Sequence, residues 1–272
     1  MHFEDNTLYY IYDPMCSWCY AFEQSLVILQ QHKPAELQFK AILGGLAADS
    51  DTPMTVATQA MIQHAWQQIE NTVPEVSFNF DFWTHNTAYR STYPACRAII
   101  AATNQSTEFA TPMRLAIQRA YYQDAKNPSL NAVLINCATE LGLDITQFSN
   151  DLVSLATNIK LTEHRHFARQ LGVSSYPSLR LVLDSEIHTI AVNYTDTKPA
   201  VEQINQLYNS QQKVSLESPC IKNCSLNDDD MCLGCFRLMD EITHWAYCNK
   251  AEQQAILDRA AQRKSQLSNK PN

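Results

Sequence analysis

Short apolar runs near both ends of the first 209 residues enclose a long middle section of helical periodicity. Near the start, the aromatic and aliphatic run at 7–13 predicts a buried β-strand, and the run at 37–43 predicts a second one. Between them, apolar positions recur at helical spacing over 16–32, and Pro34 follows shortly after. The chain is therefore expected to begin as strand, helix, strand.

The middle of the chain carries helical spacing almost throughout. Apolar residues recur three and four positions apart from Met61 to Ile69, which predicts a helix there. The methionine, tryptophan and tyrosine side chains of this section are expected to pack in the core. The same spacing predicts further helices at 93–103, 107–123, 129–141, 145–157 and 160–171.

Strand character returns after these helices. A turn that contains Pro177 leads into a predicted strand that ends at Leu183, and the run at 187–192 can pair with it as a hairpin. A helix at about 198–209 follows. This order of elements predicts an α/β protein with a thioredoxin-like fold and a helical domain inserted at about 50–171.

The end of the chain differs in composition from the rest. A polar segment at 210–217 predicts a linker between a first domain at 1–209 and a small cysteine-rich helical module at 218–264. The last residues, 265–272, are rich in lysine, serine and asparagine, and we expect them to be disordered.

Composition and charge restrict the compartment and the partners. A hydrophobic content of 45% is enough for a packed core, and a net charge of −8 argues against nucleic acid or an anionic membrane as the main partner. No apolar run approaches the ~20 residues of a membrane span, and the first ten residues lack the basic and apolar regions of a secretory signal. We therefore expect a cytoplasmic protein, in which nine cysteines indicate redox or metal roles more than structural disulfides.

The most specific chemical signal is the motif Cys16-Ser17-Trp18-Cys19, which lies between the first strand and the first helix. The N-terminal end of a helix favours an anion, here the Cys16 thiolate that attacks disulfides. Cys19 would be the resolving thiol that releases the mixed disulfide, and such a dithiol needs no cofactor. The alternatives for this pair are a structural disulfide or half of a metal site.

Three other residues near this chemistry have more than one interpretation. Asp13, at the end of the first strand, is either a helix cap or a buried carboxylate that accepts protons from Cys19. Cys96 and Cys137 lie in predicted helices and are expected to pack as small hydrophobic residues. Cys96 is the better candidate for an exception, because the neighbouring Arg97 could stabilise a thiolate.

A second group of cysteines, spaced C-x3-C-x7-C-x2-C, occupies the start of the C-terminal module. Four thiolates suit tetrahedral zinc or an iron–sulfur cluster, and zinc is slightly favoured. A metal would help a module of about 40 residues to fold. The alternative is that these thiols carry no metal and form disulfides or stay free. The candidate ligands are Cys220, Cys224, Cys232 and Cys235.

These motifs resemble two known families in tandem. Residues 7–209 resemble the DsbA-like branch of the thioredoxin superfamily, close to its FrnE-like proteins, a group expected to be protein-disulfide isomerases. Residues 218–262 resemble a small bacterial cysteine-rich domain of unknown function, often described as a possible iron–sulfur protein. The first resemblance rests on Asp13-Pro14-Met15-Cys16-Ser17-Trp18-Cys19, on Tyr93-Pro94-Ala95-Cys96-Arg97-Ala98 and on Gly172-Val173 before Tyr176-Pro177.

The first resemblance also implies roles for residues outside the dithiol. It implies a cis bond before Pro177, which would present the backbone of Tyr176 to an extended substrate opposite the two cysteines. The alternative is an ordinary trans-proline at the start of a strand. Met15 and Trp18 flank the reactive sulfur and are interpreted as an apolar contact for unfolded polypeptide. Alternatively, Trp18 packs on the helical domain.

The sequence therefore predicts a cytoplasmic thiol–disulfide oxidoreductase, either a protein-disulfide isomerase or a reductase. Its substrates would be disulfides or thiols of proteins and peptides, and glutathione or a thioredoxin-type protein is a candidate reductant. Two other functions stay open at this point. One is a glutathione-dependent or small-molecule oxidoreductase on the same fold, and the other is a redox-sensing, metal-binding adaptor.

Overall fold

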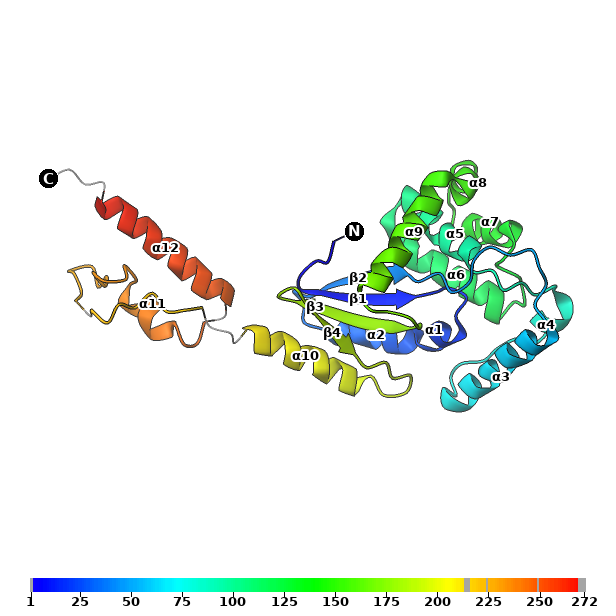
Figure 1. Cartoon of the computed structure of the whole chain (residues 1–272), viewed down its shortest axis with the longest axis horizontal. Coiled ribbons are helices and arrows are strands. Elements are labelled where there is room, and N and C mark those ends of the chain that lie inside the picture. The colour runs from blue at the N-terminus through cyan, green and yellow to red at the C-terminus, as the bar shows by residue number, and fades with distance from the viewer. Residues whose placement is uncertain (1, 213–215, 224, 249, 269–272) are drawn as a thin grey trace. The chain divides into compact units, whose positions relative to one another are not determined.

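The chain divides into two compact units, Met1–Ile204 and Asn205–Asn272. The division falls inside helix α10 (Lys198–Gln212), so the predicted linker is helical as far as Gln212, and its next three residues lie outside the described ones. The structure is a computed structural model (Figure 1) that describes residues 2–212, 216–223, 225–248 and 250–268.

The central sheet of the first unit has the strand order β2-β1-β3-β4. β1 runs parallel to β2 and antiparallel to β3, which in turn pairs antiparallel with β4. All six residues of β1 are buried, because this strand lies between two others and is covered on both faces. This is the thioredoxin-like sheet that the order of the apolar runs predicts. The strands are β1 (Thr7–Tyr12), β2 (Gln38–Leu43), β3 (Ser178–Leu183) and β4 (Glu186–Ile190).

The helical insertion comprises α3 to α9, which lie between β2 and β3 in the chain. Two helices precede it, and three follow β4. Their bounds are α1 (Ser17–Ala21), α2 (Glu23–His32), α3 (Val56–Thr72), α4 (Phe82–His85), α5 (Tyr93–Gln105), α6 (Ala110–Tyr122), α7 (Asn131–Glu140), α8 (Ile145–Val153), α9 (Leu155–Gln170), α10 (Lys198–Gln212), α11 (Met239–His244) and α12 (Lys250–Ser268), with a short 3-10 turn at Thr107–Phe109.

The sheet is covered by α9 on one face and by α2 on the other (Figure 1). Alternate residues of β1 point to opposite faces, so Tyr9 packs on the α9 side and Tyr10 on the α2 side. The Tyr10 ring lies 5.9 Å from the ring of Phe22, directly before α2. The cluster on the α9 side consists of Tyr9, Ile11, Ile42, Phe167, Ala168, Leu171, Val173 and Val182.

Three predicted boundaries are wrong. The single helix predicted at 16–32 is divided at Phe22, whose N–H is shared between the carbonyls of Trp18 (3.1 Å) and Cys19 (3.3 Å), as in a tightened last turn. The boundary between α8 and α9 lies at Ser154, because its hydroxyl accepts the Thr157 N–H and caps α9. The tail predicted as disordered is helical as far as Ser268, and 269–272 lie outside the described residues.

Within the described ranges, no helix combines the length and the apolar character that crossing a bilayer requires.

The attachment of α9 to the edge of the sheet should make stability depend on pH. The Leu43 N–H at the end of β2 donates to His164 Nδ1 (3.1 Å), so this ring nitrogen must be unprotonated. Burial, with the nearby Lys160, lowers the pKa of His164 to about 4 from its usual 6.5. Below pH 6.5 the unfolded chain therefore gains a proton that the folded chain does not, and the free energy of unfolding falls as the pH falls towards 4.

We expect His164→Gln to weaken this pH dependence, because a glutamine oxygen can accept the Leu43 N–H without titrating. Urea unfolding of the wild type should show a loss of about 1 kcal/mol between pH 7 and pH 5 that the variant lacks, after a discount for partial exposure. The exposed His166 on the same helix provides the control, since His166→Gln should behave like the wild type. Identical pH dependence in wild type and His164→Gln would contradict this account.

Candidate active site

The dithiol lies at the point where β1 ends and α1 begins. The loop Asp13-Pro14-Met15 closes with a hydrogen bond from the Cys16 N–H to the Asp13 carbonyl (3.1 Å), and Cys16 is the N-cap residue of α1. Both cysteines are free thiols. Cys16 keeps 8% of its surface exposed, whereas Cys19, one helical turn further on, is fully buried. A substrate can therefore reach the sulfur of Cys16 before that of Cys19.

The loop before β3 faces Cys16 from the other side. The Tyr176–Pro177 bond is cis, as the resemblance implies. The Cys16 thiol donates to the Tyr176 carbonyl with 3.6 Å between sulfur and oxygen. The Tyr176 ring is fixed over the end of β2, because its hydroxyl donates to the Gly44 carbonyl (2.9 Å). The structure thus brings Cys16, Tyr176 and Pro177 together from segments far apart in the sequence.

Asp13 is a buried carboxylate and not a helix cap. Cys16 occupies the cap position of α1, and its side chain makes no capping hydrogen bond. Instead, the Asp13 carboxylate accepts from the N–H groups of Met15 (2.8 Å) and Leu46 (2.6 Å) and from the Thr92 hydroxyl (2.7 Å). Burial raises the pKa of Asp13, and these hydrogen bonds oppose the rise. The cap interpretation is wrong because none of these donors lies in the first turn of α1: Met15 precedes the helix, and Leu46 and Thr92 come from distant segments.

Cys96 belongs to the same buried network. Its thiol donates to the Asp13 carboxylate over 3.6 Å, and burial together with the Asp13 charge raises its pKa well above the usual value. Arg97 does not turn Cys96 into a thiolate, because both of its terminal nitrogens bind the Asp49 carboxylate at 2.8 Å. Successive residues of a helix point about 100° apart, so Cys96 and Arg97 face different neighbours. Cys137 is buried in α7, as expected.

The electrostatics of the dithiol differ between its two sulfurs. Burial raises the pKa of Cys19 well above the usual value, and its interactions with Cys16 raise it further. Cys19 is therefore held as a neutral thiol at neutral pH. A buried thiol beside a partly exposed one is the arrangement that lets the outer sulfur react first and the inner one second.

A cavity of about 170 Å³ opens beside Cys16. Trp18 lines it and packs on Tyr194 after β4, with ring centroids 4.7 Å apart. The far wall comes from the insertion, and no sequence motif marks those residues, so analysis of the sequence did not identify them. The lining residues are Met15, Cys16, Ser17, Trp18, Leu46, Met54, Ile62, Trp66, Tyr89, Arg90, Thr92 and Tyr121.

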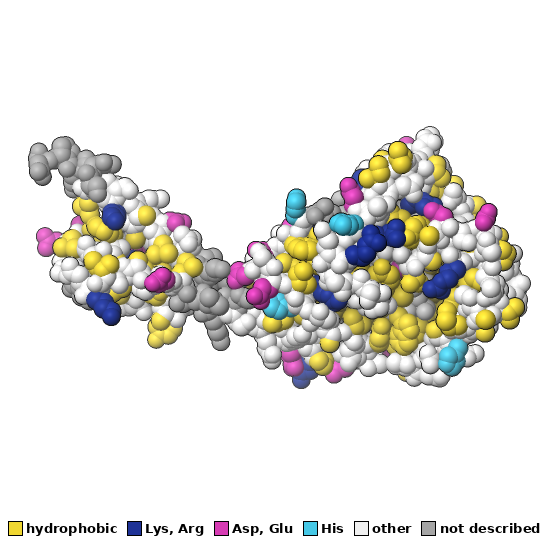
Figure 2. All heavy atoms as spheres, in the orientation of Figure 1, with side chains coloured by type: hydrophobic (Ala, Val, Ile, Leu, Met, Phe, Trp, Pro, Cys, Tyr) yellow, Lys and Arg dark blue, Asp and Glu magenta, His cyan; other side chains and the backbone are white. Residues whose placement is uncertain are grey.

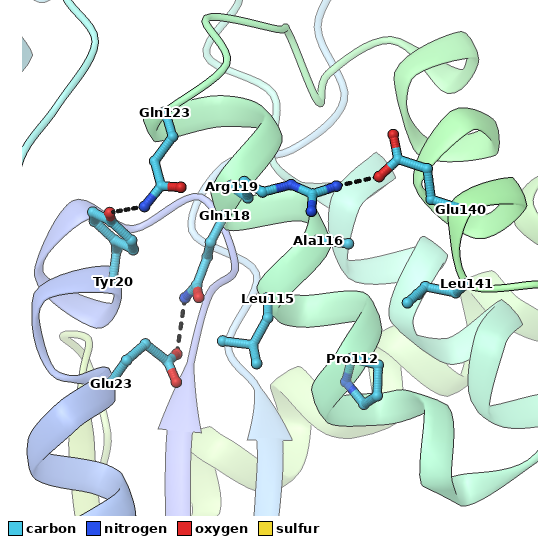
Figure 3. Close-up of a pocket in the computed structure, with 10 residues that line it drawn as sticks. All are labelled: Tyr20, Glu23, Pro112, Leu115, Ala116, Gln118, Arg119, Gln123, Glu140 and Leu141. Atoms are coloured by element: carbon cyan, nitrogen blue, oxygen red, sulfur yellow. Dashed lines mark hydrogen bonds and ion pairs between the residues drawn. The ribbon is translucent and has the colours of Figure 1, made fainter.

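A second cavity, of about 420 Å³, lies between α1, α2, α6 and α7 and contains no cysteine (Figure 3). Glu23 on its wall forms a buried ion pair with Arg114 (3.1 Å) and accepts from the Gln118 amide (2.9 Å). Burial raises the pKa of Glu23, while Arg114 opposes the rise. Figure 3 shows that Arg119 and Glu140 pair across another part of this cavity. The contacts of Glu23 attach the insertion to α2, whereas the Arg119–Glu140 pair joins α6 to α7 within the insertion.

The C-terminal unit holds the second group of cysteines. Cys232 and Cys235 are buried, Cys220 is exposed, and Cys224 lies outside the described residues. The Lys222 N–H donates to Cys220 Sγ (3.4 Å). The N–H of Cys235, and then that of Gly234, lower the pKa of Cys232, while burial opposes them. In the described part of the chain, no three cysteine, histidine or acidic side chains gather as a metal site would require.

Arg237 is the most unusual side chain near these cysteines. It is only 2% exposed, and its guanidinium lies 4.7 Å from the centre of the Trp245 ring. Its Nε donates to Cys235 Sγ (3.5 Å) and its Nη2 to the Ser218 hydroxyl (3.2 Å). Its Nη1 is buried with no partner among the described residues. A positive charge is therefore buried directly beside a cysteine sulfur.

The chain belongs to the thioredoxin family, because the family model described as thioredoxin matches residues 9–203. A second model, for a family described as a protein of unknown function (DUF1289), matches residues 218–264. The tandem arrangement that the two sets of motifs indicate is thus confirmed.

Solved structures of similar proteins cover the first unit. The crystal structure of a candidate protein disulfide isomerase from Nitrosomonas europaea is 25% identical, with a TM-score of 0.65, over 76% of this chain and 99% of that one. The cytosolic disulfide reductase DsbM from Pseudomonas aeruginosa is 21% identical, with a TM-score of 0.61, over 77% of this chain and 100% of that one. DsbM has also been solved with GSH. That structure is 21% identical, with a TM-score of 0.59, over 75% of this chain and 98% of the DsbM chain.

A curated relative is similar to part of the chain. It is the ClpXP adapter protein SpxH from Halalkalibacterium halodurans, 24% identical over 175 residues, which are 63% of this chain. The match spans 56% of that relative's own length. The fold, the exposed and buried thiols and the similar structures together support the class of thiol–disulfide oxidoreductase.

The contact between Gly44 and Tyr176 gives a test of the site. A Cβ atom on Gly44 would lie 2.1 Å from Cε1 of the Tyr176 ring, so Gly44→Ala must displace that ring, and we expect the shift to reach the Tyr176 carbonyl that faces Cys16. We expect the rate of disulfide reduction to fall about 10- to 100-fold, because small misplacements in a reacting site have effects of this size. A fluorescence assay of disulfide reduction measures the rate.

Two further variants separate displacement of the ring from loss of its hydrogen bond. Tyr176→Phe keeps the ring and removes only its bond to the Gly44 carbonyl, so its effect should be small. Tyr176→Ala should make Gly44→Ala nearly silent in the double variant, because the clash is gone. Additive losses in that double variant would show that the ring contact is not the cause.

Proposed function

We propose that the protein is a disulfide reductase or isomerase in which Cys16 is the nucleophile and Cys19 the resolving thiol. The observation that carries this proposal is the placement of Cys16 Sγ, partly exposed and 3.6 Å from the Tyr176 carbonyl, above a fully buried Cys19. A substrate that displaces the Cys16 thiol from this carbonyl occupies the mouth of the adjacent cavity. Pro177 fixes the loop that presents the carbonyl, and Met15 and Trp18 line the approach.

The reaction has two exchanges. The Cys16 thiolate attacks one sulfur of the substrate disulfide, the substrate S–S bond breaks, and the leaving thiolate takes up a proton. Cys19 then loses its proton, attacks Cys16 Sγ and releases the second substrate thiol. The substrate gains two electrons and two protons, and the protein is left with a Cys16–Cys19 disulfide. In an isomerase, a second substrate thiol resolves the mixed disulfide instead.

The surroundings of Cys19 favour a slow second exchange unless a base accepts its proton. Asp13 is a buried carboxylate whose charge acts on Cys19, and its raised pKa makes it a better proton acceptor than an exposed aspartate. We assign this role to Asp13. The names of similar proteins support a reductant such as glutathione and a cytosolic location, since DsbM is a cytosolic disulfide reductase solved with GSH.

Cysteine substitutions test the two roles. Cys16→Ser should reduce turnover of a protein disulfide to below about 1% of wild type, because serine is not a comparable nucleophile at neutral pH. Cys19→Ser should accumulate covalent adducts between Cys16 and the substrate, because the resolving exchange is lost. Intact-mass measurement detects these adducts. The matched control is Cys137→Ser, which replaces a buried cysteine in α7 and should retain activity. A fully active Cys16→Ser variant would contradict the assignment.

For the C-terminal unit we propose a metal-binding role for Cys220, Cys224, Cys232 and Cys235. The support is the spacing of the four thiols, the backbone N–H groups directed at Cys220 and Cys232, and the buried Arg237 beside Cys235. Backbone N–H groups and a buried cation both favour sulfur in its anionic form, which is the form that binds metal. Zinc or an iron–sulfur cluster would crosslink the unit and stabilise its fold.

Metal analysis tests this role directly. Anaerobically purified protein should contain about one zinc per chain, or iron with sulfide, and Cys232→Ser should lose most of it. Cys137→Ser should keep the full content, because that cysteine lies in the other unit. Removal of the metal should abolish the helical signal of the C-terminal unit and leave disulfide reduction intact. Wild-type protein purified without any bound metal would contradict the proposal.

A redox-sensing adaptor is the second candidate function, and the name of the curated relative is the observation that favours it. In that case the Cys16–Cys19 couple would report the redox state instead of turning over substrate. Reduced and oxidised protein would then differ in partner binding, while Cys16→Ser would bind like one of these two states. The turnover measured for the wild type distinguishes this function from the enzyme.

A further inference from the structure

The cavity beside Cys16 contains one charged side chain. Arg90 is the only charged residue in its lining, and the other lining residues are apolar, aromatic or hydroxyl-bearing. Among the residues that the structure describes, no carboxylate lies within ion-pair distance of Arg90. Figure 2 shows separate lysine and arginine side chains on the visible face of the first unit, among apolar and neutral ones. Arg90 therefore provides an exposed cation without a carboxylate partner among the described residues, in the wall of the cavity that Cys16 also lines.

The backbone around Arg90 is fixed on both sides. The Ser129 hydroxyl donates to the Ser91 carbonyl (2.8 Å), and the Asn127 amide donates to the Thr87 carbonyl (2.9 Å). Thr92 is tied to the Asp13 carboxylate (2.7 Å). The position from which the Arg90 side chain extends is therefore set by the same network that holds the Cys16 loop. The backbone at Arg90 is therefore fixed, and its exposed side chain reaches the cavity that Cys16 also lines.

A second donor in the cavity wall lacks an acceptor. Trp66 is fully buried in α3 and lines the cavity, and its Nε1–H has no hydrogen-bond partner among the described residues. Buried N–H groups are paired in the great majority of cases, so we expect a water or a ligand in the cavity to accept from this one. Burial raises the pKa of Tyr121, which also lines the cavity, and the Asp13 charge raises it further, while Arg90 opposes the rise. The cavity thus offers donors and a positive charge but no anionic group.

From this geometry we infer that the site prefers small disulfides that carry a carboxylate close to the sulfur, and that Arg90 determines this specificity. The inference rests on the proposed function, because the ligand reacts at Cys16. The carboxylate pairs with Arg90 while the disulfide lies against Cys16. The Cys16 thiolate attacks the nearer sulfur, one small thiol leaves with a proton, and Cys19 displaces the second, so that each disulfide yields two thiols and one Cys16–Cys19 disulfide.

Three disulfides of similar length and different charge test the inference. They are dithiodipropionate with two carboxylates, 2-hydroxyethyl disulfide without charge and cystamine with two ammonium groups. Each is mixed with pre-reduced full-length protein, and the second-order rate constant for formation of the Cys16–Cys19 disulfide is measured. Arg90→Gln should lower the rate with dithiodipropionate about 10-fold, because a close ion pair is lost, and change the rate with the uncharged disulfide less than about 2-fold.

Two control variants complete the series. Arg90→Lys keeps a positive charge and should retain most of the preference for the dianion. Arg119→Gln removes the same charge at the second cavity and should leave all three rates unchanged. An equal fall with all three disulfides, or no fall with dithiodipropionate, would overturn the role of Arg90. If the wild type reduces a protein disulfide but none of the three, the inference fails and the proposed function stands; if it reduces neither, the proposed function itself fails.

Discussion

The hydrogen bonds of the buried Asp13 carboxylate determine how the active site is assembled. A carboxylate buried without partners costs several kcal/mol, and here the donors come from three separate segments. Met15 lies in the loop before Cys16, Leu46 follows β2, and Thr92 is the N-cap residue of α5. One side chain therefore fixes the Cys16 loop relative to both the sheet and the inserted helices. The shape of the substrate cavity depends on this attachment, because all three segments contribute to its walls, together with α3 and α6.

The insertion is also held at a second point by polar contacts. Arg114 on α6 pairs with Glu23 at the start of α2 and lies over the rings of Tyr12 (5.4 Å) and Tyr10 (5.9 Å) of β1. A buried ion pair adds little net stability compared with apolar packing, but it requires one geometry. Asp13 and Glu23 lie before and after the two cysteines in the chain. These two carboxylates thus bind different helices of the insertion to the segment that carries the thiols.

The sequence predicted the features that depend on local pattern. Apolar runs identified the four strands, and the position of Cys16 and Cys19 between a strand and a helix identified the dithiol. It could not predict the wall of the cavity, because Trp66 and Arg90 reach Cys16 only through the packing of the insertion. The predicted effect of Arg97 on Cys96 was wrong for the same reason. The two residues are adjacent in the sequence, but the helix directs the Arg97 guanidinium to Asp49. Contacts between distant segments leave no signal in a single sequence.

The two units are stabilised in different ways. The first unit has a sheet covered on both faces, whereas the described core of the second contains few large apolar side chains, among them Met231, Trp245 and Ile256. Arg237 is buried within this small core. The Glu241 carboxylate binds Arg259 and Arg263 and not Arg237. A buried guanidinium needs a counter-charge, and its nearest sulfur is that of Cys235. A core built in this way is best balanced when the neighbouring cysteines are thiolates, which is the state that a bound metal imposes.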